Sequence, residues 1–244
     1  MKRIIRMPSL ILAGTAVVVL GAHRANAANS IAWGTAQNIT AASDVSTSGT
    51  LVDAGDITST VSVNTVPFDV ITGPGSGATD AYGHITVQYS GSAGAGTTGL
   101  TGSYATILSN EVHGTSSGAP ETITLSGLTV GHQYQIEYWA NDFGDSAYKG
   151  AVLSGSPSVS LLSDNPANNG GLGQFSIGTY VADASSVSFT YSEPAGLVAV
   201  IDAIQLRDQG VSVPEPSIWI LGSLGGAVVL VWSQRRPLRK VGVS

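Results

Sequence analysis

Residues 133–142 read Q-Y-Q-I-E-Y-W-A-N-D, and their alternating character indicates a β-strand. Successive side chains of a strand point to opposite faces of its sheet. One face of this strand therefore carries Tyr134, Ile136 and Tyr138. The opposite face carries a ring, amides and a carboxylate, which belong to Gln135, Glu137, Trp139 and Asn141. A strand with two such different faces indicates a sheet that packs at least one side against a core.

Similar segments recur along the chain and favour an all-β fold. Gly, Ser and Thr are abundant, whereas Glu and Lys, which favour helices, are scarce. A short helix is expected at 104–109, and the run at 197–206 is so apolar that it predicts a strand buried on both faces. The spacing of the strands predicts an antiparallel β-sandwich with a jelly-roll-like order. The predicted strands are 58–64, 66–71, 84–89, 121–125, 134–140, 186–191 and 197–206.

The N-terminal segment has the order of a secretory signal peptide. Basic residues at its start are followed by an apolar run at 10–20 and by the small residues Ala25 and Ala27. This order predicts export and cleavage by signal peptidase after Ala27, which leaves 1–27 as the signal peptide. Residues 28–207 then form the expected β-sandwich domain, and 208–213 a linker. The chain has no cysteine, so the exported domain is expected to fold without disulfides.

The C-terminal segment predicts a short membrane helix between a proline-containing strip and a basic end. Pro214 and Pro216 fix their own backbone and extend the residue before each, so 213–217 is expected to be a stiff, extended strip. Residues 218–232 carry no charge and would span about 22 Å as a transmembrane helix, less than the thickness of a bilayer core. A basic end at 235–240 is expected to stay on the cytoplasmic side of the inner membrane. Its residues are Arg235, Arg236, Arg239 and Lys240.

This order of Pro-Glu-Pro box, apolar helix and basic end resembles the PEP-CTERM sorting segment of exported bacterial proteins. The resemblance covers 214–240 and rests on the motif Pro214, Glu215 and Pro216. It implies that an exosortase processes the chain. It also implies that the protein reaches the cell envelope or the exterior of a Gram-negative-type bacterium, with a link to exopolysaccharide or biofilm.

The domain between the two ends is more loosely similar to the β-rich passengers of PEP-CTERM proteins. The similar segments are 31–34, 43–47, 125–131 and 201–206. Such passengers resemble carbohydrate-binding jelly rolls. This similarity therefore implies a fold and a class of ligand, and it assigns no functional residues.

Charge is distributed unevenly between the domain and its ends. All but one of the 16 acidic residues lie within 28–213, where Lys149 and Arg207 are the only basic residues. So acidic a domain repels phosphate backbones, which argues against nucleic acid as a partner. Acids in loops suit calcium, although Asn and Asp are also ordinary turn formers. The candidate calcium ligands are Asp142, Asp145 and Asp164.

The polar face of the strand at 133–142 predicts a sugar-binding site. An aromatic ring stacks on the apolar face of a pyranose, while amides and carboxylates bind its hydroxyl groups. The alternative interpretation is that Trp139 belongs to the core and that the polar residues lie at a sheet edge. The candidate glycan-binding residues are Gln135, Glu137, Trp139 and Asn141.

Signs of catalysis are scarce in the sequence. The histidines of the domain, His84, His113 and His132, lie in separate segments without the spacing of metal ligands. Glu137 and Asp142 are the one pair of acids considered for glycosidase chemistry, which needs two carboxylates at one cleft. We therefore expect a non-enzymatic protein, with a secreted polysaccharide hydrolase as the alternative.

Together these features predict an exported envelope or extracellular-matrix protein that is transiently anchored in the inner membrane. Its expected role is structural or carbohydrate-binding, with exopolysaccharide as the ligand and calcium as the cofactor to test. A third interpretation is a scaffold without any ligand.

Overall fold

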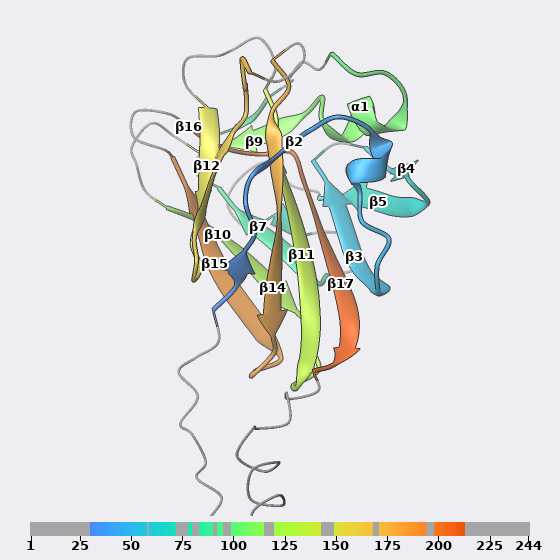
Figure 1. The fold of residues 1–244 in the computed structure, drawn as a ribbon, viewed down its shortest axis with the longest axis vertical. Helices are drawn as coiled ribbons and strands as arrows, with labels where there is room; N and C mark the ends of the chain where they lie inside the picture. Colours follow the sequence, from blue (N-terminus) through green and yellow to red (C-terminus); the bar gives the residue numbers. More distant parts are fainter. Residues whose placement is uncertain are drawn as a thin grey trace, which may run out of the picture.

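The computed structural model describes residues 30–57, 59–71, 78–79, 83–89, 92–94, 99–114, 120–142, 149–167, 171–193 and 198–212. The predicted signal peptide, with Ala25 and Ala27, and the predicted sorting segment at 214–240 lie outside these residues. Within the described part of the chain, no helix is long and apolar enough to cross a membrane. The described residues are mainly β-strand and form two sheets in a β-sandwich-like arrangement (Figure 1).

Eight of the described strands form the first sheet, in which β11 and β17 are neighbours. Across the sheet, the order is β1 (Ala32–Trp33), β14 (Gln174–Val181), β11 (His132–Ala140), β17 (Ala203–Val211), β3 (Thr50–Asp56), β5 (Val66–Val70) and β4 (Val61–Val63), with β2 (Gln37–Asn38) also paired to β14.

Nine of the described strands form the second sheet, in which β10 and β15 are neighbours. Across the sheet, the order is β6 (Ala78–Thr79), β7 (Ile85–Gln88), β10 (Glu121–Ser126), β15 (Ser186–Ser192), β12 (Lys149–Leu153), β16 (Val198–Ile201), β9 (Glu111–His113) and β8 (Ser92–Gly94), with β13 (Val159–Leu162) also paired to β12.

Four antiparallel pairs are nested in the chain, one inside the next. β3 pairs with β17, β10 with β15, β11 with β14, and β12 with β13. Successive pairs lie alternately in the first and the second sheet. Two pairings among the described strands are parallel, β3 with β5 and β12 with β16, so the sheets are mixed rather than purely antiparallel as expected.

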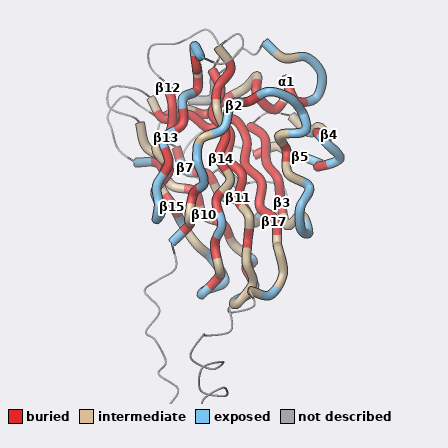
Figure 2. The backbone as a smooth tube through the Cα atoms, viewed as in Figure 1, coloured by how far each residue is buried: buried red, intermediate tan, exposed pale blue. Residues whose placement is uncertain are grey.

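The main core lies between the two sheets. Tyr134, Ile136 and Tyr138 of β11 belong to the same buried cluster as Ile123 of β10 and Tyr191 of β15. The Tyr138 hydroxyl donates to the carbonyl oxygen of Val200 at 2.6 Å, so this buried polar group is satisfied. The tube view shows the central strands buried in their upper part and only partly buried at their lower ends (Figure 2). The face of β11 that was expected to be apolar therefore packs into the sandwich.

A second buried cluster covers the outward face of the first sheet. Trp139 and Phe175 project from the sheet into this cluster. The layer above them comes from the β4–β5 hairpin, from the helix α1 (Ser103–Ile107), and from Ile39 and Val45, which lie on either side of a 3₁₀ turn named η1 (Ala42–Asp44). The ring of Phe68 on β5 lies 5.9 Å from the ring of Trp139, although two strands separate β5 from β11 in the sheet. The hairpin therefore folds back over the sheet, at the end where α1 also lies (Figure 1).

Several sequence-based expectations are confirmed. The strands β5, β7, β10, β11 and β15 lie where alternation predicts strands, and α1 overlaps the helix expected at 104–109. The expected strand at 58–64 is shorter and forms only β4. Among the strands that were not predicted are three long or central ones and a short edge strand, because their sequences contain acids, glycines or serines that weaken the apolar pattern. These strands are β3, β12, β13 and β14.

The expectation of one strand at 197–206 is wrong. The run divides into β16 and β17, which lie in different sheets. At Asp202, between them, the backbone N–H donates to the carbonyl oxygen of Trp139, and the side chain accepts a backbone N–H from Asn141. These bonds hold the chain where it passes between sheets. The linker expected at 208–213 is also corrected, because β17 continues to Val211.

Gly178 lies in the middle of β14 because Trp33 and Ile31 pack directly against it. A Cβ atom at this position would lie 2.7 Å from side-chain atoms of both residues. Gly178→Ala is therefore expected to destabilise the domain by about 1–3 kcal/mol through overpacking. Urea unfolding measures this change, and Gly99→Ala is the control, since open space surrounds Gly99. Equal midpoints for the two variants would contradict the packing argument.

Candidate functional site

The structure buries the face that was predicted to bind sugar. Glu137, Trp139 and Asn141 are each 0% exposed, and Gln135 is half-buried. The Trp139 ring lies against Phe68 and Phe175, with ring centroids 5.9 and 6.4 Å apart. A ring enclosed in this way cannot stack on a sugar, so the alternative interpretation of Trp139 as a core residue is the one observed.

The side chain of Asn141 hydrogen-bonds to two other segments of the chain. Its side-chain amide donates to the carbonyl oxygen of Leu108, and its side-chain oxygen accepts the N–H of Gly173 at 3.0 Å. The residue therefore joins the end of β11 to the end of α1 and to the segment before β14. These bonds occupy the amide that had been expected to contact a ligand.

A hollow opens above the buried face, where three segments meet. It has a volume of about 440 Å³ and is formed by the turn before η1, by β4 with its following turn, and by the start of α1. A volume of this size is in the range of small-molecule sites. Hydroxyl and amide groups dominate its polar lining, and they belong to Thr40, Ser62, Asn64, Thr101, Ser103 and Tyr104.

A chain of hydrogen bonds connects the floor of the hollow to the core. The Trp139 indole N–H donates to the Tyr104 hydroxyl at 3.2 Å, and that hydroxyl donates to Asp44 at 3.3 Å. Asp44 also accepts the backbone N–H groups of Thr40 and Ala41 at 2.6 and 3.0 Å. Burial, and then the nearby Asp44, raise the pKa of Tyr104 far above its ordinary value, so the residue remains a neutral donor. The wall of the hollow is thus fixed by groups already bonded to one another.

The turn at the rim of the hollow is strained. Asn64 and Thr65 have φ values of 46° and 66° and connect β4 to β5. This two-residue turn requires positive φ at both positions, where Asn and Gly are favoured and a β-branched threonine is an outlier. The Asn64 amide donates to the carbonyl oxygen of Val45 at 2.8 Å, which holds the turn against the neighbouring segment. Strained turns of this kind concentrate at functional sites.

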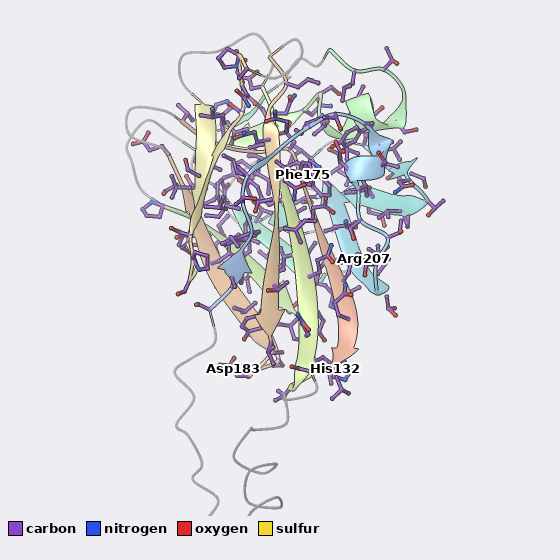
Figure 3. The ribbon with its side chains drawn as sticks, in the orientation of Figure 1. His132, Phe175, Asp183 and Arg207 are labelled. Carbon is purple, nitrogen blue, oxygen red and sulfur yellow. The ribbon has the colours of Figure 1, made fainter. Side chains whose placement is uncertain are left out.

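Residues 45–49, here named the strap, cross the outward face of the first sheet below the hollow. The strap lies over Glu137, Gln205 and Arg207, all of which are buried. Glu137 accepts the backbone N–H of Ser46 at 3.0 Å and a short hydrogen bond from the Gln205 side chain. Arg207 donates to carbonyl oxygens of the strap, and its side chain is labelled on β17 in Figure 3.

Burial governs the charge state of these groups. Desolvation raises the pKa of Glu137 to about 7, against the hydrogen bonds from Ser46 and Gln205, which lower it. Desolvation also lowers the pKa of Arg207, while the nearby Glu137 opposes that shift. An acid that titrates near neutrality is a candidate for acid–base chemistry or for pH sensing. Glu137 does not line the hollow, so it does not face the space in which a ligand would bind.

A second group of buried acids lies where the chain passes between the sheets. Burial, and then the nearby Glu111, raise the pKa of Asp202 well above its ordinary value, and Asp56 and Asp142 add to this effect. Asp202 accepts the N–H of Asn141 at 2.5 Å through one carboxyl oxygen, and its other oxygen has no hydrogen-bond partner within the described part of the chain. Neutral, protonated Asp202 is therefore favoured in the folded protein.

The calcium candidates do not come together in the described residues. Asp142 belongs to the buried group around Asp202, Asp164 is half-buried after β13, and Asp145 lies outside the described residues. Among the residues described, no three His, Cys, Asp or Glu side chains are placed to hold a metal ion.

The remaining candidates for chemistry are also separated. Glu137 and Asp142 are both buried and neither lines the hollow, so they do not form a glycosidase-type pair at this site. His132 lies at the opposite end of β11 (Figure 3), where its ring is hydrogen-bonded to Asp208 at 2.8 Å. The sequence reasoning missed the hollow because its residues are ordinary Ser, Thr and Asn in three distant segments. The adjacent Asn64 and Thr65 between two valine-rich strands were the one local sign of a tight turn there.

Comparison with known proteins finds no match to a protein-family model, to a curated protein or to a solved structure.

The buried acids around Asp202 predict a specific dependence of stability on pH. Because the folded state raises the pKa of Asp202, its contribution to stability is full at low pH and is lost as the pH rises. Asp202→Asn keeps an acceptor for Asn141 and removes the charge. We expect it to raise the melting temperature at pH 8 by about 3 °C or more, since 1 kcal/mol corresponds to roughly 2–4 °C in a domain of this size.

Differential scanning calorimetry from pH 5 to 8 measures this effect, with and without calcium. Asp69→Asn is the control, because Asp69 is half-buried on β5 and lies outside this group of acids. The advantage of Asp202→Asn is expected to shrink toward pH 5. A variant that melts lower than the wild type, and that loses a calcium-dependent stabilisation, would instead show that the acids require a cation.

Proposed function

We propose that this chain is an exported envelope or extracellular-matrix protein whose β-sandwich binds carbohydrate without catalysing a reaction. The hollow of about 440 Å³ carries the binding part of this proposal. The order of the Pro-Glu-Pro box, apolar run and basic end carries the export part. Exopolysaccharide is the proposed ligand, and the exosortase and signal peptidase are the partners during export.

The strand order supports a jelly-roll assignment for the domain. A jelly roll is a long antiparallel hairpin that is wound so that its nested pairs alternate between two sheets. The pairs β3–β17, β10–β15, β11–β14 and β12–β13 have this nesting and alternate in this way. We therefore propose that β4–β9 and α1 are an insertion between the first and second strands of a jelly roll.

The chemistry of the hollow supports a hydroxyl-rich ligand. Small hydroxyl and amide side chains exchange hydrogen bonds with sugar hydroxyl groups at little cost in side-chain entropy. Ala41 and Ala42 add apolar contact beside them. Tyr104 is 3% exposed, so recognition would depend on hydrogen bonds rather than on ring stacking. A hydrolase would need two carboxylates facing this hollow, and its described lining contains none.

Filling the hollow is expected to abolish binding. Ser62 is exposed on β4 and lines the hollow, so Ser62→Trp places a large side chain within it. We expect at least a tenfold loss of affinity for the polysaccharide that the wild type binds best in a panel of bacterial and plant polysaccharides. Affinity electrophoresis measures the change.

Ser160→Trp is the matched control for this substitution. Ser160 is also an exposed serine in a short strand, β13, and it does not line the hollow. Ser160→Trp is expected to bind like the wild type. Equal losses in both variants would contradict a site at the hollow, and no binding by the wild type to any polysaccharide would favour a scaffold.

A substitution within the Pro-Glu-Pro motif tests the proposed processing by an exosortase. Glu215→Ala is expected to leave the unprocessed chain in the membrane fraction of a bacterium that contains an exosortase, because the motif would no longer be recognised. Mass spectrometry of the tagged protein distinguishes processed from unprocessed chains. Pro237→Ala is the control, since this proline lies among the basic residues and outside the motif. Normal processing of Glu215→Ala would contradict the assignment.

A further inference from the structure

The strap at 45–49 is attached to the sheet by side chains that are spaced two residues apart. Gln205, Arg207 and Gln209 project from β17 toward the strap, as the alternation of a strand requires. Gln205 donates to the carbonyl oxygen of Ser46 at 3.2 Å, and Gln209 donates to that of Ser48 at 3.0 Å. A row of polar side chains therefore binds the backbone of the strap.

Arg207 holds the centre of the strap. Its guanidinium donates to the carbonyl oxygens of Thr47, Ser48 and Gly49 at 3.0, 2.6 and 2.8 Å. Its other contact is with the side-chain oxygen of Gln205 at 3.5 Å. The single buried cation of the described side chains is thus directed at backbone carbonyls. Its hydrogen bonds do not reach the carboxylate of Glu137.

Glu137 holds the beginning of the strap through one oxygen. That oxygen accepts the Ser46 N–H and the Gln205 side chain, while the other oxygen is buried and has no hydrogen-bond partner in the described part of the chain. The neighbouring residue on β14 is Ile177, which is apolar. The charged or titratable groups facing Glu137 are Asp44 from η1, Tyr104 from α1 and Arg207 from β17.

These surroundings suit a neutral side chain better than a carboxylate. Asp44 repels a charge on Glu137, Tyr104 remains neutral, and Arg207 attracts the charge without bonding to it. A buried ion that lacks full hydrogen bonding is costly, so ionisation favours any state in which water reaches it. The strap is the cover nearest to Glu137, and its own residues 47–49 are exposed. Opening the strap from Ser46 onward would therefore hydrate the carboxylate.

We propose that the strap is a proton-controlled latch, which is closed over Glu137 when this side chain is neutral and is released when it ionises. The strap continues directly from η1, whose Asp44 fixes the wall of the hollow. Release would therefore loosen one wall of that hollow. The latch itself depends on no ligand, so its test does not rest on the proposed function.

The direction of the pH effect follows from the raised pKa of Glu137 in the closed state. The closed latch is fully favoured below the ordinary pKa of a glutamate, near 4.5, and loses this advantage as the pH rises to about 7. From pH 5 to pH 8, the closed-to-open ratio is expected to fall by roughly 10- to 100-fold.

Hydrogen exchange followed by mass spectrometry tests the latch on the purified protein. After correction for the intrinsic effect of pH, the peptide containing 45–49 should exchange roughly 10- to 100-fold faster at pH 8 than at pH 5. Glu137→Gln keeps an acceptor for Ser46 and Gln205 and has no charge, so its strap should exchange at a rate independent of pH. Glu193→Gln removes an acid at the end of β15, away from the strap, and should behave like the wild type.

Two results would overturn the proposal. One is a pH dependence that is the same in Glu137→Gln as in the wild type. The other is an equal acceleration of the peptide containing β11, because this would show unfolding of the whole domain rather than release of the strap. The ¹³C resonance of the Glu137 carboxyl in the wild type provides a measurement that needs no variant. It should shift through the same pH range in which strap exchange accelerates, and a resonance that titrates near 4.5 would also reject the latch.

Discussion

The first sheet must bury both of its faces at the end where β11 carries Trp139, and much of the rest of the molecule follows from this requirement. On β11, Tyr138 packs between the two sheets while Trp139 packs outward, and each is 0% exposed. A sheet in a simple sandwich buries one face only. Here the outward face requires an additional layer, which the β4–β5 hairpin, α1 and the residues on either side of η1 provide. The polar groups within that face require partners as well, and the backbone of the strap supplies them.

The limits of prediction from the sequence follow from the same requirement. Alternation correctly separates Ile136 from Glu137, because the direction of a side chain depends on its own strand. Whether the Glu137 face meets water depends on segments that lie far away in the chain, and no local pattern contains that information. The run at 197–206 was interpreted as one strand because Asp202 is the single charged residue within it. Its change of sheet depends on bonds to Trp139 and Asn141, which only the folded chain brings near.

Charge composition is limited in a related way, because it does not show where in the fold the charges lie. The acidity of the domain was interpreted as a property of its surface, but part of it is internal. The buried acids of the described residues outnumber the buried bases, of which Arg207 is the one described. Composition counts charges without locating them, so it overstates the negative field outside the domain. The buried acids are Asp53, Asp56, Glu111, Glu121, Glu137, Asp142 and Asp202.

The position of β17 has a mechanical consequence. This strand lies between β11 and β3 and ends at Val211, opposite His132. A pull on the chain beyond Val211 slides β17 lengthwise between its two neighbours. The hydrogen bonds of both ladders lie across the direction of that pull, so they share the load and must yield together. An edge strand would instead peel away one bond at a time. The sandwich thus resists shear along its own last strand.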